Sequence, residues 1–262
     1  MRALNIASTG MAAQEANVEI ISNNIANMRT TGFKRQRAEF QDLLYQSMRQ
    51  VGSSSSDTGT VLPTGVDVGS GVKLVATPRV MSQGTVALTE KTYDVAIKGE
   101  GFFQVQLPDG RTAYTRDGSF ELDANGQLVT ADGYTVLPGI TVPTNALSVS
   151  ISATGGVEAT VQGQTAPQAL GQIELARFIN KSGLEAKGDN LFLETPASGT
   201  PLVDNPGAEG FGSTLQSYLE ASNVNAVTEI SDLIAAQRAY EMNSKVVSSA
   251  DQMLQSTSSM LR

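Results

Sequence analysis

The sequence contains no cysteine, no histidine and no tryptophan among its 262 residues. Without cysteine, a disulfide framework, a thiolate nucleophile and a cysteine-based metal site are all excluded. Without histidine, the commonest general base and the commonest metal ligand are missing. A catalytic site would have to use carboxylates, lysine, tyrosine or serine alone. We therefore expect a protein that is not an enzyme, with no catalytic residue, no cofactor and no metal.

Basic residues are outnumbered, since 18 Lys and Arg stand against 26 Asp and Glu and give a formal net charge of -8. Proteins that bind nucleic acid carry clustered Lys and Arg, so we expect no nucleic acid as a partner. No apolar run is long enough to span a bilayer. The N-terminus lacks the continuous apolar region of a secretory signal, because Asn5, Ser8 and Thr9 interrupt it.

Proline is absent from both ends of the chain, because all nine prolines lie between Pro63 and Pro206. Proline breaks helix interiors, so long helices fit only 1–62 and 207–262. In both regions apolar residues recur every seven residues, which predicts one narrow apolar stripe per helix. The stripes consist of Leu4, Met11, Val18 and Ile25, with Ile21 at an intervening step, and of Leu219, Ala226, Leu233, Tyr240, Val247, Leu254 and Leu261.

The pattern alone leaves open whether these stripes cover a globular core or pack against other helices. The residues between the stripes are largely Ser, Asn, Gln and Ala. Because only one stripe on each helix is apolar, packing of helix on helix is favoured.

The middle of the chain has the pattern of β-structure. Aromatic residues make up only 5% of the chain, so its core must rely on Val, Ile, Leu and Ala. Short runs of β-formers alternate with turn dipeptides, which predicts an antiparallel meander. The turn dipeptides are Asp109-Gly110, Asp117-Gly118, Asn125-Gly126 and Asp132-Gly133. Before this region, 52–71 is rich in Ser, Gly and Thr and is expected to be a loop or extended connector.

The predicted class is therefore α+β, with the N- and C-terminal helices paired as a coiled-coil-like layer beside a central all-β domain. We expect a terminal helical assembly domain from 1–33 with 222–262. A connector region is expected from 34–74 with 207–221, and the central β domain from 75–206.

Two short patterns could suggest binding sites. Residues 34–37 (KRQR) form a small basic cluster that could contact lipid head groups, although a solvated helix face is the expected role. Residues 123–126 (DANG) resemble the start of a calcium loop but lack its later ligands and flanking helices. We adopt neither as a site.

Several stretches resemble signatures of the flagellar rod and hook axial protein family. They are 23–27 (NNIAN) with 31–34 (TGFK), 94–103 (DVAIKGEGFF), 222–225 (SNVN) and 236–245 (AQRAYEMNSK). The first is typical of a helix that ends near Asn27, followed by a turn at Gly32 with Phe33 as an anchor. The matching motif residues are Asn24, Asn27, Gly32, Phe33, Gln237, Arg238 and Tyr240. The region from Phe40 to Gly71 is most similar to the distal-rod branch of the family.

The resemblance implies a structural subunit that polymerises into the rigid, hollow shaft of the distal rod. The shaft would transmit motor torque across the periplasm to the hook, and it would form part of the export channel. Implied partners are further copies of the chain, proximal rod proteins, the hook protein, the peptidoglycan- and outer-membrane-ring proteins, and the flagellar export apparatus. The resemblance also implies export without a cleaved signal peptide.

The resemblance assigns the two helices to the assembly interface. The residues expected there are Leu4, Met11, Val18, Ile21, Ile25, Leu219, Leu233, Tyr240, Val247 and Leu254. The residues by themselves also allow a secreted binding module, whose β-domain recognises a surface polymer and whose helices only dimerise. An enzyme that uses only carboxylates would need a cleft with paired Asp or Glu, and no motif indicates one.

Overall fold

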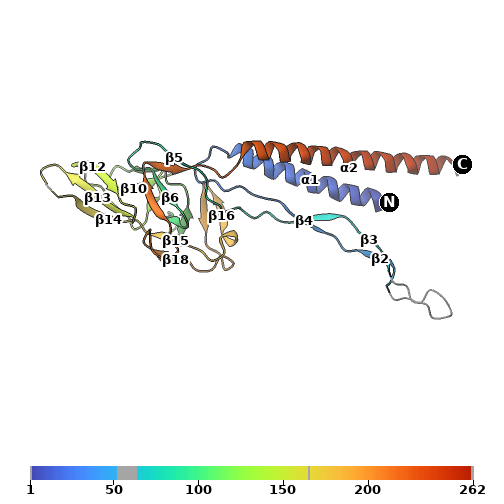
Figure 1. Ribbon diagram of the computed structural model, residues 1–262, viewed down its shortest axis with the longest axis horizontal. Coiled ribbons are helices and arrows are strands. Elements are labelled where there is room, and N and C mark those ends of the chain that lie inside the picture. The colour runs from blue at the N-terminus through green and yellow to red at the C-terminus, as the bar shows by residue number, and fades with distance from the viewer. Residues whose placement is uncertain (1, 52–63, 165, 261–262) are drawn as a thin grey trace. The chain divides into compact units, whose positions relative to one another are not determined.

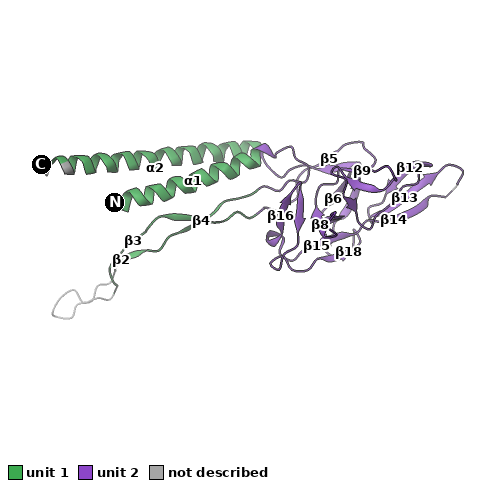
Figure 2. Cartoon of the chain, turned by 180° about the vertical axis from the view of Figure 1, so that it is seen from behind, with its two compact units in different colours: residues 1–25, 36–78, 226–262 green, residues 26–35, 79–225 purple. Residues whose placement is uncertain are grey.

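The computed structural model of the protein describes residues 2–51, 64–164 and 166–260 (Figure 1). Its contacts divide the chain into two compact units (Figure 2). Unit 1 consists of 1–25, 36–78 and 226–262, and unit 2 of 26–35 and 79–225. Terminal helices and a β-rich middle confirm the predicted α+β class.

Unit 1 contains the long helices α1, Arg2–Ala26, and α2, Ala226–Met260. Both lie in the proline-free ends, as predicted, and α1 ends next to Asn27. After α1 the chain turns, with the Thr30 N–H donating to the Asn27 carbonyl at 3.2 Å. Glu229 lies in the first turn of α2, where a carboxylate interacts favourably with the helix dipole.

Unit 1 also contains two-stranded antiparallel ribbons between the helices in sequence. Strand β1, Glu39–Asp42, pairs with β4, Val72–Ala76, and β2, Gln46–Arg49, pairs with β3, Val66–Val68. Of the predicted connector 52–71, residues 52–63 lie outside the described residues, and the rest is extended at β3. Most residues of these strands are exposed, and an isolated two-stranded ribbon is only marginally stable in water.

Unit 2 is built from antiparallel strands. In the described residues its largest sheet has the order β16-β17-β8-β7-β11-β10-β9, and β15 pairs with both β7 and the edge strand β18. The strands of this sheet are β7 Phe102–Gln106, β8 Thr112–Thr115, β9 Phe120–Leu122, β10 Leu128–Thr130, β11 Thr135–Val136, β15 Leu175–Arg177, β16 Glu185–Gly188, β17 Leu191–Leu193 and β18 Leu202–Asp204.

Smaller sheets complete unit 2. Strands β12, Ala146–Ile151, β13, Gly156–Val161, and β14, Gln168–Gln172, form a sheet in that order. Strand β19, Ser213–Gln216, pairs with β6, Val95–Lys98. Strand β20, Tyr218–Glu220, pairs with β5, Val86–Leu88. Residues 213–220 are therefore integrated into the β-rich unit, whereas the sequence-based division placed 207–221 in a connector region.

The predicted meander is interrupted at one of its four turns. The turns at Asp109-Gly110, Asn125-Gly126 and Asp132-Gly133 each join strands that pair with one another. Asp117-Gly118 instead separates β8 from β9, which are not neighbours in the sheet. The Gly118 carbonyl accepts the Val95 N–H at 3.0 Å, and a Cβ on Gly118 would lie 1.7 Å from the Val95 carbonyl oxygen. Glycine at this position therefore lets the backbone pass close to the start of β6, and it does not form a hairpin turn.

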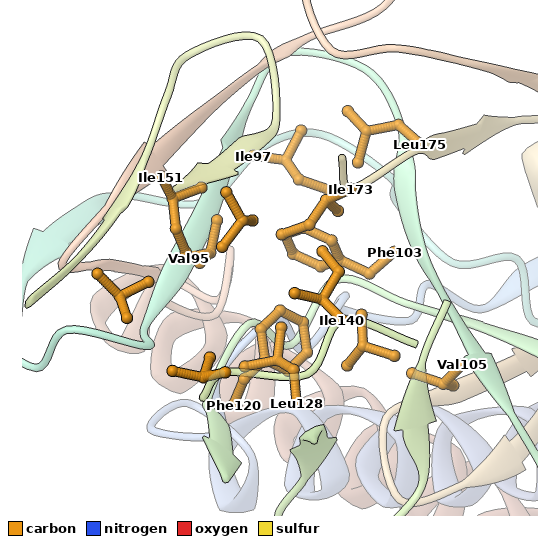
Figure 3. Packing of buried hydrophobic residues seen from close by; sticks show 14 of the residues in the cluster. Val95, Ile97, Phe103, Val105, Phe120, Leu128, Ile140, Ile151, Ile173 and Leu175 are labelled. Carbon is orange, nitrogen blue, oxygen red and sulfur yellow. The ribbon is translucent and has the colours of Figure 1, made fainter. Parts of the chain in front are cut away.

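The core of unit 2 consists mainly of Val, Ile and Leu from several sheets, as the low aromatic content predicts (Figure 3). Phe103 and Phe120 pack edge to face in it, with ring centroids 5.0 Å apart. A second buried cluster gathers Phe102, Tyr114 and Phe178 with Ala176, Leu184 and Phe192. Four aromatic residues thus gather around β7, β8 and β17 and the end of β15.

Replacing Phe103 by alanine should lower the free energy of unfolding of unit 2 by about 3–5 kcal/mol, because it leaves a cavity in a fully buried site. Denaturant unfolding followed by circular dichroism measures the change. Ile179→Ala is the matched control, since that side chain is 87% exposed and should change stability by less than about 0.5 kcal/mol. Equal effects of the two substitutions would contradict the assignment of this core.

Candidate assembly surface

The helices α1 and α2 lie side by side and run antiparallel, so that the start of α1 and the end of α2 lie at the same end of the pair (Figure 1). Two contacts define their register. Asn24 donates a hydrogen bond to Glu229 at 3.1 Å, and a Cβ added to Gly10 would lie 2.9 Å from the Asn243 amide nitrogen. Each step along α1 is therefore matched by a step in the opposite direction along α2.

The buried face of this helix pair is made largely of small residues. It includes Ala7, Ala13, Ile21 and Asn24 of α1 and Glu229, Ala236 and Ala250 of α2. Small side chains let two helix backbones approach closely, as Gly10 does beside Asn243. Among the described residues, Ile21 is the one large apolar side chain of the pair that is fully buried, and several others are half-buried.

Large apolar side chains remain exposed along α2. They are Val227, Ile230, Ile234, Tyr240, Met242, Val246, Met253, Leu254 and Met260, and Ile6 is exposed on α1. Large exposed apolar surfaces typically mark sites that another molecule covers. We take these exposed apolar side chains of α2 as the candidate assembly surface.

The predicted interface residues differ in exposure, although those of α2 are spaced by seven residues and so lie along one side of the helix. Ile21 is buried, Leu4, Met11, Val18, Ile25, Leu233 and Val247 are half-buried, and Tyr240 and Leu254 are exposed. Leu219 is not on the helix at all, because it pairs with Ala87 in strand β20 of unit 2. The expectation that it begins the C-terminal helical stripe was therefore wrong. Whether these residues contact another subunit stays a prediction.

The family-motif residues also differ in their surroundings. Asn24, Gly32 and Phe33 are buried, Asn27 is half-buried, and Gln237, Arg238 and Tyr240 are exposed on α2. Gly32 has φ +66°, and a Cβ there would lie 2.8 Å from the backbone of Arg116 and Asp117. Glycine is required at this position by both the positive φ and the close approach.

The segment 26–35 is packed into unit 2 although it lies far from the rest of that unit in sequence. The Gly32 N–H donates to the Glu220 carbonyl at 2.7 Å, and the Arg35 N–H donates to the Asn223 side chain at 2.8 Å. Phe33 lies between these two anchors and is buried. The predicted anchoring role of Phe33 is thus consistent with its environment.

A buried charged cluster adjoins this segment. The Glu220 carboxylate lies 2.5 Å from the Lys34 amine and 3.2 Å from the Arg116 guanidinium, and all three side chains are buried. Lys34 also donates to the Ser82 carbonyl at 2.9 Å, Arg116 donates to the Gly99 carbonyl at 2.8 Å, and the Gly84 N–H donates to Glu220 at 2.8 Å. We call Lys34, Arg116 and Glu220 the charged triad.

Burial lowers the pKa of both Lys34 and Arg116, because it disfavours the charged form, and the Glu220 carboxylate opposes this effect in each case. The expectation that 34–37 is a solvated helix face was wrong for Lys34, since α1 ends at Ala26 and this lysine is buried. Sequence reasoning missed the triad because Glu220 and Arg116 are distant in the chain. A single charged residue directly after the anchor Phe33 was the one available signal.

We examined the remaining polar groups of unit 2 for metal ligands and for a lined groove. The described residues contain no group of three or more Asp and Glu placed to hold a metal ion. A groove of ≈ 620 Å³ is lined by Arg111, Tyr114 and Glu194 among others. Burial and the neighbouring Glu194 raise the pKa of Tyr114 to about 12, so the phenol stays protonated at neutral pH. In the described chain, no helix combines the length and apolar character needed to cross a membrane.

Three family models match the chain in the order of its elements. Residues 4–34 match the flagella basal body rod protein, 96–159 the flagellar hook protein FlgE/F/G D1 domain, and 215–260 the flagellar basal body rod FlgEFG protein C-terminal. The charged triad takes one residue from each matched segment. Together with the paired terminal helices, these matches define an axial protein of the flagellar rod and hook class.

Relatives that match the whole chain narrow this class. The flagellar basal-body rod protein FlgG of Caulobacter vibrioides is 60% identical and covers 98% of both chains. Those of Buchnera aphidicola subsp. Schizaphis graminum and Agrobacterium fabrum are 53% and 51% identical and cover 97% of both chains. The chain belongs to the flagellar basal-body rod protein family, which confirms the resemblance found in its sequence, and it is a structural subunit of the flagellar rod.

Replacing Glu220 by leucine should lower the free energy of unfolding of unit 2 by about 3–5 kcal/mol, because it leaves two buried cations without their counter-ion. Denaturant unfolding of the purified chain measures this loss. The triple replacement Lys34→Met, Arg116→Met and Glu220→Leu should recover most of the stability, since apolar residues can replace a buried ion cluster.

The partly exposed pair of Lys181 and Glu100 provides the control. Lys181→Ala should cost less than about 1 kcal/mol, because solvent screens such pairs. If Glu220→Leu proves no more destabilising than Lys181→Ala, the triad does not hold unit 2 together.

Proposed function

We propose that this chain polymerises through its terminal helices into the rigid, hollow shaft of the flagellar distal rod. The shaft would transmit motor torque to the hook and form part of the export channel. The observation that carries the proposal is the set of exposed apolar side chains of α2, which occur along the helix from Val227 to Met260. High identity to rod proteins over nearly the full length supports the assignment to the rod.

The proposed first partner is a second copy of the chain. The small buried residues of α1 and α2 are covered within one subunit, so the exposed apolar side chains of α2 remain for neighbours. Tyr240 and Leu254 are the predicted interface residues of α2 that are themselves exposed. Half-buried residues such as Leu233 would connect these exposed residues to the contact between α1 and α2.

Further partners follow from a position in the rod of the basal body. We propose that proximal rod proteins and the hook protein contact the two ends of the assembly. Ring proteins of the peptidoglycan and outer membrane would surround its outside, and the flagellar export apparatus would deliver the chain without cleavage of a signal peptide. The protein would act as a structural element and not as an enzyme.

The proposal predicts that Leu233→Asp prevents polymerisation at concentrations where the parent assembles, and that it leaves unit 2 folded. The substitution places a carboxylate in a half-buried helix contact, where an unpaired charge costs several kcal/mol. A penalty of about 3 kcal/mol per subunit would raise the concentration needed for assembly by roughly a hundredfold. Sedimentation with negative-stain imaging measures assembly, and the parent should form straight tubes.

Leu147→Asp is the matched control, since this exposed residue lies on β12 of unit 2. It should leave assembly intact, and limited proteolysis should give the same central fragment from the parent and both variants. Tubes formed by Leu233→Asp would disprove the role of the helices. Discrete dimers of the parent would instead support the alternative, a binding module dimerised by its helices.

A further inference from the structure

We propose that Asn24 and Glu229 fix the register of α1 against α2. Through that register they set how far the end of α2 extends past the start of α1. The inference concerns contacts within a single chain. Its consequence for neighbouring subunits rests on the proposed function, since the extended end of α2 would form part of the assembly surface.

The Asn24 amide is held on every side. Asn24 and Glu229 are 1% and 2% exposed. The Asn24 nitrogen donates to the Glu229 carboxylate at 3.1 Å and to the Gln36 carbonyl at 2.9 Å. The Asn24 oxygen accepts the Gln36 N–H at 2.9 Å. The amide is thus oriented by the backbone at Gln36 and presents its remaining hydrogen to α2.

The apolar stripes cannot fix the register by themselves. Each repeats every seven residues, so a shift of one helix by seven residues again places apolar side chains opposite one another. The close contact of Gly10 with Asn243 tolerates the same shift. Its two alternative partners, Ala236 and Ala250, are smaller than asparagine and already lie on the buried face.

The polar pair does not tolerate this shift. A slip of seven residues places Asn24 opposite Ala236 in one direction and beyond the start of α2 in the other. Either slip separates the Asn24 amide from the Glu229 carboxylate. Asn24 is buried and would then lose the acceptor of one amide hydrogen, which is costly, so the slipped arrangements are disfavoured.

The register determines which part of α2 has no α1 residue beside it. Gly10 lies across from Asn243, and eight more residues along each helix bring Arg2 across from Asp251. Residues 252–260 of α2 therefore extend past the described start of α1. This end carries Met253, Leu254 and Met260, the last of which is 85% exposed. A slip of seven residues would move this end by about 10 Å relative to α1. Subunits of a regular polymer could not then present the same surface.

The absence of native cysteine allows a direct test by disulfide trapping. Gly10→Cys with Asn243→Cys reports the native register, because these two positions are in contact. Gly10→Cys with Ala250→Cys, or with Ala236→Cys, reports a slip of seven residues in either direction. Intramolecular cross-links are quantified by non-reducing gel electrophoresis of dilute monomer.

In a chain that carries only the paired cysteine substitutions, the native pair should cross-link at least about tenfold more than either slipped pair. Glu229→Leu should reduce that excess by about tenfold, because it removes the partner of Asn24. Glu229→Gln should keep the parent's ratio, since its side-chain oxygen still accepts the hydrogen bond. Glu241→Leu, an identical change at an exposed site of α2, should also keep it.

An unchanged ratio in Glu229→Leu overturns the inference, and so does an equal shift in Glu241→Leu. If neither the native nor a slipped cysteine pair cross-links while Asn24 and Glu229 are intact, the inference is also overturned, because the helices would then not be paired. Polymerisation of the cysteine-free parent is measured separately by sedimentation. If the native cysteine pair cross-links but the cysteine-free parent never polymerises, the proposed function is refuted and the register inference stands.

Discussion

The structure of unit 2 depends on one buried carboxylate. Glu220 neutralises Lys34 from the start of the chain and Arg116 from its middle, and none of the three is accessible to water. Because an unpaired buried charge is far more costly than a missing apolar contact, all three segments must be in place together. The pairing of β19 with β6 and of β20 with β5 brings Glu220 to the site. Closure of the triad therefore couples the start, middle and end of the chain.

This coupling gives a physical reason for the motif around Gly32. The glycine lets the backbone turn with a positive φ against Arg116 and Asp117, which brings Phe33 and Lys34 into unit 2. A side chain at position 32 would displace the segment, and Lys34 would then lose Glu220. The motif residues thus act together, and the charged residue that follows Phe33 contributes as much to the anchor as the aromatic ring.

The positions of the helices and most hairpins could be predicted from the sequence, but the long-range partners of individual residues could not. Proline distribution predicted where long helices occur, and turn dipeptides predicted most hairpins, because both depend on local backbone preferences. The spacing of Leu219 from Ala226 fits a helix, yet pairing with β5 holds it in a strand, since tertiary contacts override a local period. Lys34 has the sequence context of a solvated charge. Its partner Glu220 lies 186 positions away, and no local pattern relates the two.

Both units use a polar contact to select one arrangement out of several that apolar burial would allow. In unit 1 Asn24 meets Glu229, and in unit 2 Lys34 meets Glu220, so each contact joins the first part of the chain to the last. Apolar surfaces are tolerant of displacement because burial is not directional, whereas a buried hydrogen bond or ion pair requires its own partner. The internal register of α1 and α2 therefore does not require the large apolar side chains of α2. Those side chains are free to face outward without loss of a unique fold, which is the condition that a subunit with an exposed helical surface must meet.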